Sequence, residues 1–359
     1  MSLSHAALAT VFDDIENLSL TPSSGDIQRL VQDWKVSATK AIINVRGRIC
    51  FPETEECLSG IRSRAHAGMP QCKGLELWLC RRIYTDACIL SALVQDAAGK
   101  SLEAIGTLDY ALIIAGAAGE SRFEIIHGLI HAFQAPLREA SPVVATNDGP
   151  EEPVEPLPTT LASSTFPIPR ISEPSFLSFQ STQSKAPFIV PGYAQGWPAL
   201  NEHPWRRASH LRAASGPGRV VPVEVGENYL SDKWNQVIMS WDAFLSSLDF
   251  EDQETCRVQV EEIQYLAQHN LFTQMPALED DIEIPVYAYA CLTSDGRVHQ
   301  PPSNERQLVI NSWLGPKGTI SPPHTVSAFV DANVYKILIA LRTHFTTFMC
   351  KLSAKKPSG

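Results

Sequence analysis

The chain has 359 residues, 44% hydrophobic and 19% charged, a globular composition that is long enough for two domains and a sizeable core. Its formal net charge of −10 excludes the strongly basic footprint of a nucleic-acid-binding domain, so no direct nucleic-acid binding is expected. The eight cysteines include no C-x-x-C pair. Because a chain of this length does not need a disulfide framework, we expect reduced intracellular thiols.

We expect neither a signal peptide at the N-terminus nor a membrane span in the apolar stretch near the end of the sequence. The first residues, MSLSHAALATVFDDIENL, lack the basic and long apolar regions of a signal peptide. The most apolar late stretch, VSAFVDANVYKILIALRTHF, is interrupted by Asp331, Lys336 and Arg342 and is a poor membrane span. We therefore expect a protein of the nucleus and/or cytoplasm that does not enter a membrane.

Residues 1–140 are expected to form a helical N-terminal domain. Two apolar stripes with a spacing of three or four residues occupy positions 102–112 and 123–133, which is typical of amphipathic helices. Their members are Leu102, Ile105, Leu108, Leu112, Phe123, Ile126, Ile130 and Phe133. The stretch LELWLCRRIYTDACILSALV (75–94) predicts a further, buried helix.

The composition changes twice after the helical region. Residues 141–185 are rich in proline, serine and acidic residues, which cannot bury enough apolar surface to offset ordering and predict a linker. From residue 186 the pattern favours strands, with a short helix at MSWDAFLSSL (239–248). The expected strands are FIVPGY (188–193), RVVPVEVG (219–226), EIQYLAQH (262–269) and QLVINSWLG (307–315).

The last expected strand has two different faces. Leu308, Ile310 and Leu314 share one face, which is aliphatic and should meet the core. Asn311 and Trp313 share the other face with Val309, and this mixture of polar and aromatic side chains is interpreted as a pocket wall. An ordinary core position for Trp313 is the alternative.

Several sequence blocks resemble one known family. The blocks PVEVGENY (222–229), EIQYLAQHNLFTQMPALEDDIEIPVY (262–287) and INSWLGPKGTISPPH (310–324) are similar to the cupin-like JmjC oxygenases. The nearest branch is that of the lysine-demethylase-8-like arginyl hydroxylases, which the helical stretch 75–94 also resembles. The resemblance implies an α+β protein: a helical N-terminal domain and, over residues 186–325, a double-stranded β-helix that lacks its later strands.

The same resemblance implies an iron(II) and 2-oxoglutarate dioxygenase with a metal site of two histidines and one carboxylate. The first histidine matches His324, but the carboxylate position two residues later is Val326, and the second histidine is expected beyond Gly359. The position of the family's cofactor-binding lysine is Ile339. Residues 326–359 are therefore predicted to be an aberrant tail of a truncated domain, and we hypothesise that they are a translated intron or a wrong exon.

The resemblance also implies binding residues. Tyr265 and Ser321 match positions that contact 2-oxoglutarate, and Glu224, Tyr229 and Trp313 match positions in the substrate pocket. An acidic residue with aromatic walls suits an Arg or Lys side chain of a protein substrate. The expected function is that of a protein hydroxylase or demethylase that is inactive as written, because its metal triad is incomplete. The alternative is a non-catalytic protein-interaction module.

Other histidines give weaker signals. His127 and His131 form an H-x-x-x-H pair on a predicted helix, a spacing that can bind zinc, but no third ligand is evident, so surface histidines are the default interpretation. His269 is interpreted as a structural or pocket-edge residue. His203 and His210 lie in a loop-rich stretch and indicate no chemistry.

Overall fold

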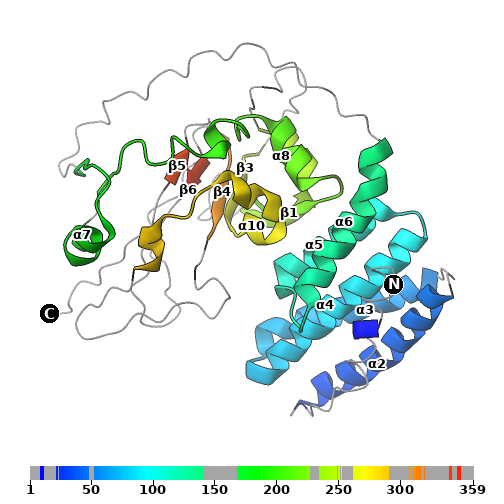
Figure 1. Cartoon of the computed structure of the whole chain (residues 1–359). Helices are drawn as coiled ribbons and strands as arrows, with labels where there is room; N and C mark the ends of the chain where they lie inside the picture. Colours follow the sequence, from blue (N-terminus) through cyan, green and yellow to red (C-terminus); the bar gives the residue numbers. More distant parts are fainter. Residues whose placement is uncertain are drawn as a thin grey trace. The chain divides into compact units, whose positions relative to one another are not determined.

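The computed structural model divides the chain into two compact units (Figure 1). One unit contains residues 1–144, 216–221 and 238–243, and the other contains 145–215, 222–237 and 244–359. The residues that the structure describes are 9–11, 22, 24–47, 52–140, 168–186, 188–226, 234–248, 250, 252, 262–290, 308, 310–316, 319, 339–341 and 346–348.

The first unit is built on a helical bundle. Its helices are α2 (Gly25–Arg46), α3 (Pro52–Gly68), η1 (Met69–Gln71), α4 (Gly74–Ala97), α5 (Ser101–Ala115) and α6 (Arg122–Ala140). Helix α4 packs against α2, α3, α5 and α6, and it is accordingly buried along most of its length (Figure 1). The predicted helices of this region are confirmed. No helix among the described residues combines the length and apolarity needed to cross a membrane.

Buried ion pairs fix elements of this first unit. The carboxylate of Asp109 on α5 accepts hydrogen bonds from Nε and one terminal nitrogen of Arg219, at 2.9 and 2.6 Å, and from the backbone N–H of Val220. Asp86 on α4 pairs in the same way with Arg82 and Arg122. Because a buried charge is costly unless it is paired, arrangements that separate Asp109 from Arg219, or Asp86 from Arg122, are disfavoured.

The sheet has the strand order β2-β1-β3-β4-β6-β5. The strands are β1 (Val220–Val225), β2 (Asn235–Ser240), β3 (Gln264–His269), β4 (Ser312–Leu314), β5 (Ile339–Leu341) and β6 (Thr346–Phe348). The pairs β1–β3, β3–β4, β4–β6 and β5–β6 are all antiparallel. Helices combined with a small antiparallel sheet make this an α+β protein.

In the sequence, short helices precede the strands and alternate with them. They are α7 (Phe176–Ser181), η2 (Gln183–Lys185), η3 (Pro198–Leu200), α8 (Ala208–Ser215), α9 (Trp241–Ser246), α10 (Leu271–Gln274), η4 (Pro276–Asp281) and η5 (Val286–Tyr289). Helix α9 confirms the helix expected at 239–248, and its apolar residues Trp241, Phe244 and Leu245 are buried.

The predicted strands are confirmed only in part. Strands β1 and β3 lie where RVVPVEVG and EIQYLAQH predicted them, and β4 is shorter than predicted among the described residues. The expected strand at 188–193 is wrong. Ile189 makes an isolated bridge to Arg170, and a run of turns begins at Pro191, whose missing N–H cannot continue a strand ladder.

The predicted linker (141–185) and the predicted tail (326–359) both contain helices or strands. Helix α7 and the turn η2 lie within the range predicted as a linker, of which residues 141–167 are outside the described part. Strands β5 and β6 lie within 326–359, the predicted tail, and β6 pairs with β4 at Leu314 and Thr346. The domain boundaries drawn from the sequence stay predictions.

Candidate functional site

One face of the sheet brings together three residues that the sequence singled out. Glu224 on β1 and Tyr265 on β3 are directly paired, so their side chains lie on the same face. Leu266 is paired with Leu314 on the opposite face. Since side chains alternate along a strand, Trp313 on β4 shares the face of Glu224 and Tyr265. We refer to Glu224, Tyr265 and Trp313 as the acidic-aromatic face.

The other side of the sheet is apolar. Val223, Leu266 and Leu314 are buried, with exposed fractions of 0%, 0% and 7%. Of the three residues predicted to meet the core, Leu314 lies in β4 and is buried, whereas Leu308 and Ile310 precede the strand and are only partly buried. Trp313 is also buried, at 7% exposure, so a core role for its ring stays open beside the pocket-wall interpretation.

The ring of Tyr265 lies against Gly315, the residue that follows the neighbouring strand β4. The register of β3 and β4 places Gly315 opposite Tyr265. A Cβ added to Gly315 would lie 2.6 Å from Cδ2 of the Tyr265 ring and 3.0 Å from Oγ1 of Thr319. Such a distance is far shorter than carbon–carbon van der Waals contact, so the ring occupies the space that the missing side chain leaves.

Strand β3 changes its register immediately after this row. The pairing shifts between Leu266 and His269, and Gln268 adopts a φ of 54°, in the left-handed region that is uncommon for residues other than glycine. The bulge ends at His269, whose Nε2 contacts Oε1 of the buried Gln274 at 2.8 Å. This contact fits the structural or pocket-edge interpretation of His269.

The remaining predicted site residues lie outside the described part of the chain. They are His324, Ser321 and Tyr229. Their roles as metal ligand, 2-oxoglutarate contact and substrate contact stay predictions.

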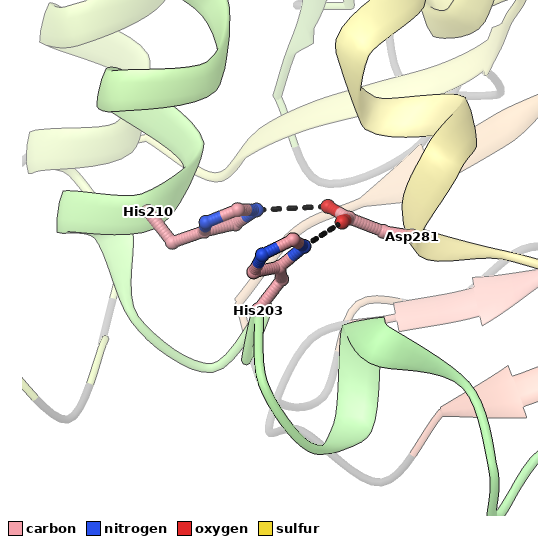
Figure 2. A group of neighbouring side chains, drawn as sticks. All are labelled: His203, His210 and Asp281. Atoms are coloured by element: carbon pink, nitrogen blue, oxygen red, sulfur yellow. Dashed lines mark hydrogen bonds and ion pairs between the residues drawn. The ribbon is translucent and has the colours of Figure 1, made fainter.

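A second group of polar side chains was not predicted. Figure 2 shows the rings of His203 and His210 side by side, both directed at the carboxylate of Asp281. His203 Nδ1 lies 2.6 Å from Oδ1 of Asp281, and His210 Nε2 lies 2.8 Å from Oδ2. The two rings are stacked with 5.0 Å between centroids and 12° between planes. We refer to His203, His210 and Asp281 as the His-His-Asp cluster.

Separate elements position the members of this cluster. His203 follows η3, and its backbone N–H donates to the carbonyl of Pro198 at 2.8 Å. His210 lies in α8, whose first backbone N–H groups, those of Ala208 and Ser209, donate to the carboxylate of Asp252. Asp281 is the last residue of η4.

The carboxylate of Asp281 is the buried centre of the cluster. Besides the two imidazoles, the indole N–H of the buried Trp205 donates to Oδ2 at 2.7 Å. Burial alone would raise the pKa of Asp281, but the hydrogen bonds from His210, Trp205 and His203 outweigh burial and hold the pKa below its usual range. Asp281 is therefore a carboxylate at neutral pH.

Sequence reasoning could not find this cluster from local spacing. Asp281 is 78 positions from His203 and 71 positions from His210. The two histidines lie on opposite sides of the start of α8, which the sequence did not mark as a helix. Only the block resemblance over 262–287 placed Asp281 in a structured region.

The chain is similar to known proteins over half or more of its length. The chain is 31% identical over 260 residues to "Lysine-specific demethylase 8" of Danio rerio, covering 68% of this chain and 57% of the relative. It is 38% identical over 183 residues to "Jumonji C domain-containing protein 5" of Drosophila melanogaster, covering 50% and 41%. It is 29% identical over 285 residues to "Lysine-specific demethylase JMJ30" of Arabidopsis thaliana, covering 72% and 60%.

These similarities define the class of the chain, which is related to the JmjC-domain proteins. The chain belongs to the JmjC demethylase-like family, as its sequence blocks predicted. It spans about half the length of the relatives that it matches. No family model matches the chain.

The iron(II) ion that this relationship implies does not fit the motif of this chain. Two residues after His324, where a carboxylate is required, stands Val326. An isopropyl group has no lone pair and cannot bind a metal ion. The His-His-Asp cluster has two imidazoles and a carboxylate, but none of its three residues belongs to this motif.

Proposed function

We propose that this chain is a JmjC-type protein whose acidic-aromatic face receives an Arg or Lys side chain of a protein partner. The proposal includes a partial double-stranded β-helix as the fold of the sheet region. Two of the relatives are named as lysine-specific demethylases, which supports a basic side chain as the ligand. The observation that carries the proposal is the pairing of Glu224 with Tyr265 on one sheet face, together with Trp313 on the next strand.

The chemistry of these three side chains suits a cation. A carboxylate attracts a guanidinium or ammonium group and accepts its hydrogen bonds. An aromatic ring adds attraction between the cation and the face of the ring. The side chains of Glu224 and Tyr265 are each partly buried, so a ligand on this face would be partly shielded from water, which strengthens both effects. Tyr229 completes the predicted pocket.

We further propose that binding on this face is not followed by oxidation. In the family, iron(II) and 2-oxoglutarate supply the oxidising power, and the sequence resemblance assigned Tyr265 and Ser321 to 2-oxoglutarate. We assign the ring of Tyr265 to the basic side chain instead, because Tyr265 is paired with Glu224. With Val326 in the carboxylate position, His324 has no partner within its motif to hold iron. The chain would then act as a protein-interaction module of the nucleus and/or cytoplasm.

Replacing Glu224 with Gln is expected to weaken binding of an arginine-containing peptide about tenfold, because the substitution removes the charge and keeps the shape. The measurement is fluorescence anisotropy with a labelled peptide. The matched ligand is the same peptide with citrulline in place of arginine, which should bind weakly to both proteins.

A control separates this effect from general electrostatics. Glu283 is outside the acidic-aromatic face and exposed, and Glu283→Gln removes the same formal charge. We expect it to leave peptide affinity within about twofold of the unchanged protein. Equal weakening by both substitutions would show that net charge, and not the sheet face, determines binding.

A further inference from the structure

We propose that the His-His-Asp cluster is a binding site for one borderline divalent metal ion of the Zn²⁺ type. The site would be formed by Nδ1 of His203, Nε2 of His210 and Oδ1 of Asp281. It is independent of the acidic-aromatic face and of the His324 motif, so it does not rest on the proposed function.

The donor atoms are already gathered. The three ligand atoms all lie within 4.8 Å of one another. Figure 2 shows both rings presenting a nitrogen to the same carboxylate. In a tetrahedral zinc site with bonds of about 2.1 Å, ligand atoms are about 3.4 Å apart. The 2.6 Å contact between His203 Nδ1 and Oδ1 of Asp281 therefore needs to open by less than about 1 Å to admit the ion. His210 Nε2 now contacts Oδ2 at 2.8 Å, and it must turn from this oxygen toward the ion.

The side chains have room for this opening. The side chain of His203 is 52% exposed and that of His210 is 21% exposed, whereas that of Asp281 is 2% exposed. His203 lies in a bend between η3 and α8, and not within a helix or strand. The exposed ring can thus move while the buried carboxylate stays fixed, and water can occupy the remaining coordination position.

Metal binding requires the protons on the two imidazole rings to be redistributed. Each inner ring nitrogen now faces the carboxylate and must lose its proton before it can bind a metal ion. The outer nitrogens, His203 Nε2 and His210 Nδ1, make no hydrogen bond with the described residues, so they can carry the proton instead. A neutral ring exchanges one tautomer for the other through solvent, and a protonated ring releases one proton.

Trp205 supplies outer support for the same site. Its indole N–H holds Oδ2 of Asp281, which leaves Oδ1 to face the metal ion. Such hydrogen bonds to a ligating carboxylate are a regular feature of metal sites and fix the orientation of the ligand. Two imidazoles with one carboxylate suit zinc and similar ions, whereas Mg²⁺ and Ca²⁺ prefer oxygen ligands alone.

The test is isothermal titration calorimetry, in which ZnCl₂ is added to the metal-free full chain at pH 7.5. We expect one Zn²⁺ to bind per chain with a Kd in the micromolar range or lower, and no comparable binding of MgCl₂. No Zn²⁺ binding by the unaltered chain, which needs no variant to fold, would overturn the proposal.

Variants locate the ion. His203→Ala and His210→Ala should each weaken Zn²⁺ binding at least tenfold, and Trp205→Phe should weaken it about tenfold while one ion per chain is kept. His131→Ala is the matched control, since it removes an exposed histidine of the H-x-x-x-H pair on α6. Circular dichroism verifies that each variant is folded. Affinity unchanged in His203→Ala and His210→Ala, or lost in His131→Ala, would place the ion elsewhere and contradict the assignment.

Discussion

Asp109→Ala is expected to lower the free energy of unfolding of the helical unit by about 3–5 kcal/mol. The substitution leaves the guanidinium of Arg219, whose side chain is 4% exposed, without its bidentate partner. It also removes the acceptor of the Val220 backbone N–H at the start of β1. A buried cation without its anion is far more costly than the absence of the whole pair. Urea denaturation followed by circular dichroism measures the change.

A surface ion pair provides the control for this prediction. Asp26 contacts Arg29 on α2, and the side chains of both residues are largely exposed. Because exposed pairs are screened by water and salt, Asp26→Ala should leave the urea midpoint essentially unchanged. The burial argument fails if Asp109→Ala shifts the midpoint no more than Asp26→Ala does.

Gly315→Ala is expected to weaken peptide binding to the acidic-aromatic face more than tenfold. The added methyl group would lie 2.6 Å from Cδ2 of Tyr265, so the aromatic ring must leave its position beside Glu224. Overpacking of this kind costs about 1–3 kcal/mol of stability as well. Anisotropy with the arginine-containing peptide measures the affinity, and urea denaturation measures the stability.

Gly60→Ala is the matched substitution for Gly315→Ala. Gly60 lies within α3, and an added Cβ there would meet nothing within 4 Å. Since alanine is a better helix former than glycine, this change should keep or raise stability by about 0.5–1 kcal/mol and leave peptide affinity unchanged. Full peptide affinity in Gly315→Ala would mean that the position of the Tyr265 ring does not matter for binding.

The helices were predictable because their signals are local. In the two predicted stripes, the residues inside the helices are buried, as Ile105 and Ile126 at 0% exposure illustrate. The first member of each stripe behaves differently, with Leu102 54% and Phe123 38% exposed. Both lie in the first turn of their helix. Periodicity identifies the buried face, but it does not indicate where packing begins.

The sheet was harder to predict because strand pairing is not local. The sequence identified β1 and β3, whose apolar residues alternate or follow one another between turn signals. It missed β2, in which the first two residues are exposed and the next three are only partly buried, so no alternation marks the strand. The register that pairs Glu224 with Tyr265 also depends on contacts between distant segments.

The two candidate sites also differ in how far the sequence could reveal them. Glu224, Tyr265 and Trp313 were found through family resemblance, and the sheet places them on one face. His203 and His210 belong to no recognised motif, and their partner Asp281 is distant in sequence. A cluster formed by long-range packing leaves no spacing pattern, so only three-dimensional contacts could reveal it.

The most direct test of the central claim, that this JmjC relative binds a basic side chain without oxidising it, is succinate formation from 2-oxoglutarate. The full chain is supplied with iron(II), ascorbate, 2-oxoglutarate and the arginine-containing peptide, and an active 2-oxoglutarate oxygenase is assayed in parallel. With Val326 in the carboxylate position of the motif, the account predicts no succinate above the level of the protein-free mixture. Several molecules of succinate per chain, dependent on added iron, would contradict it.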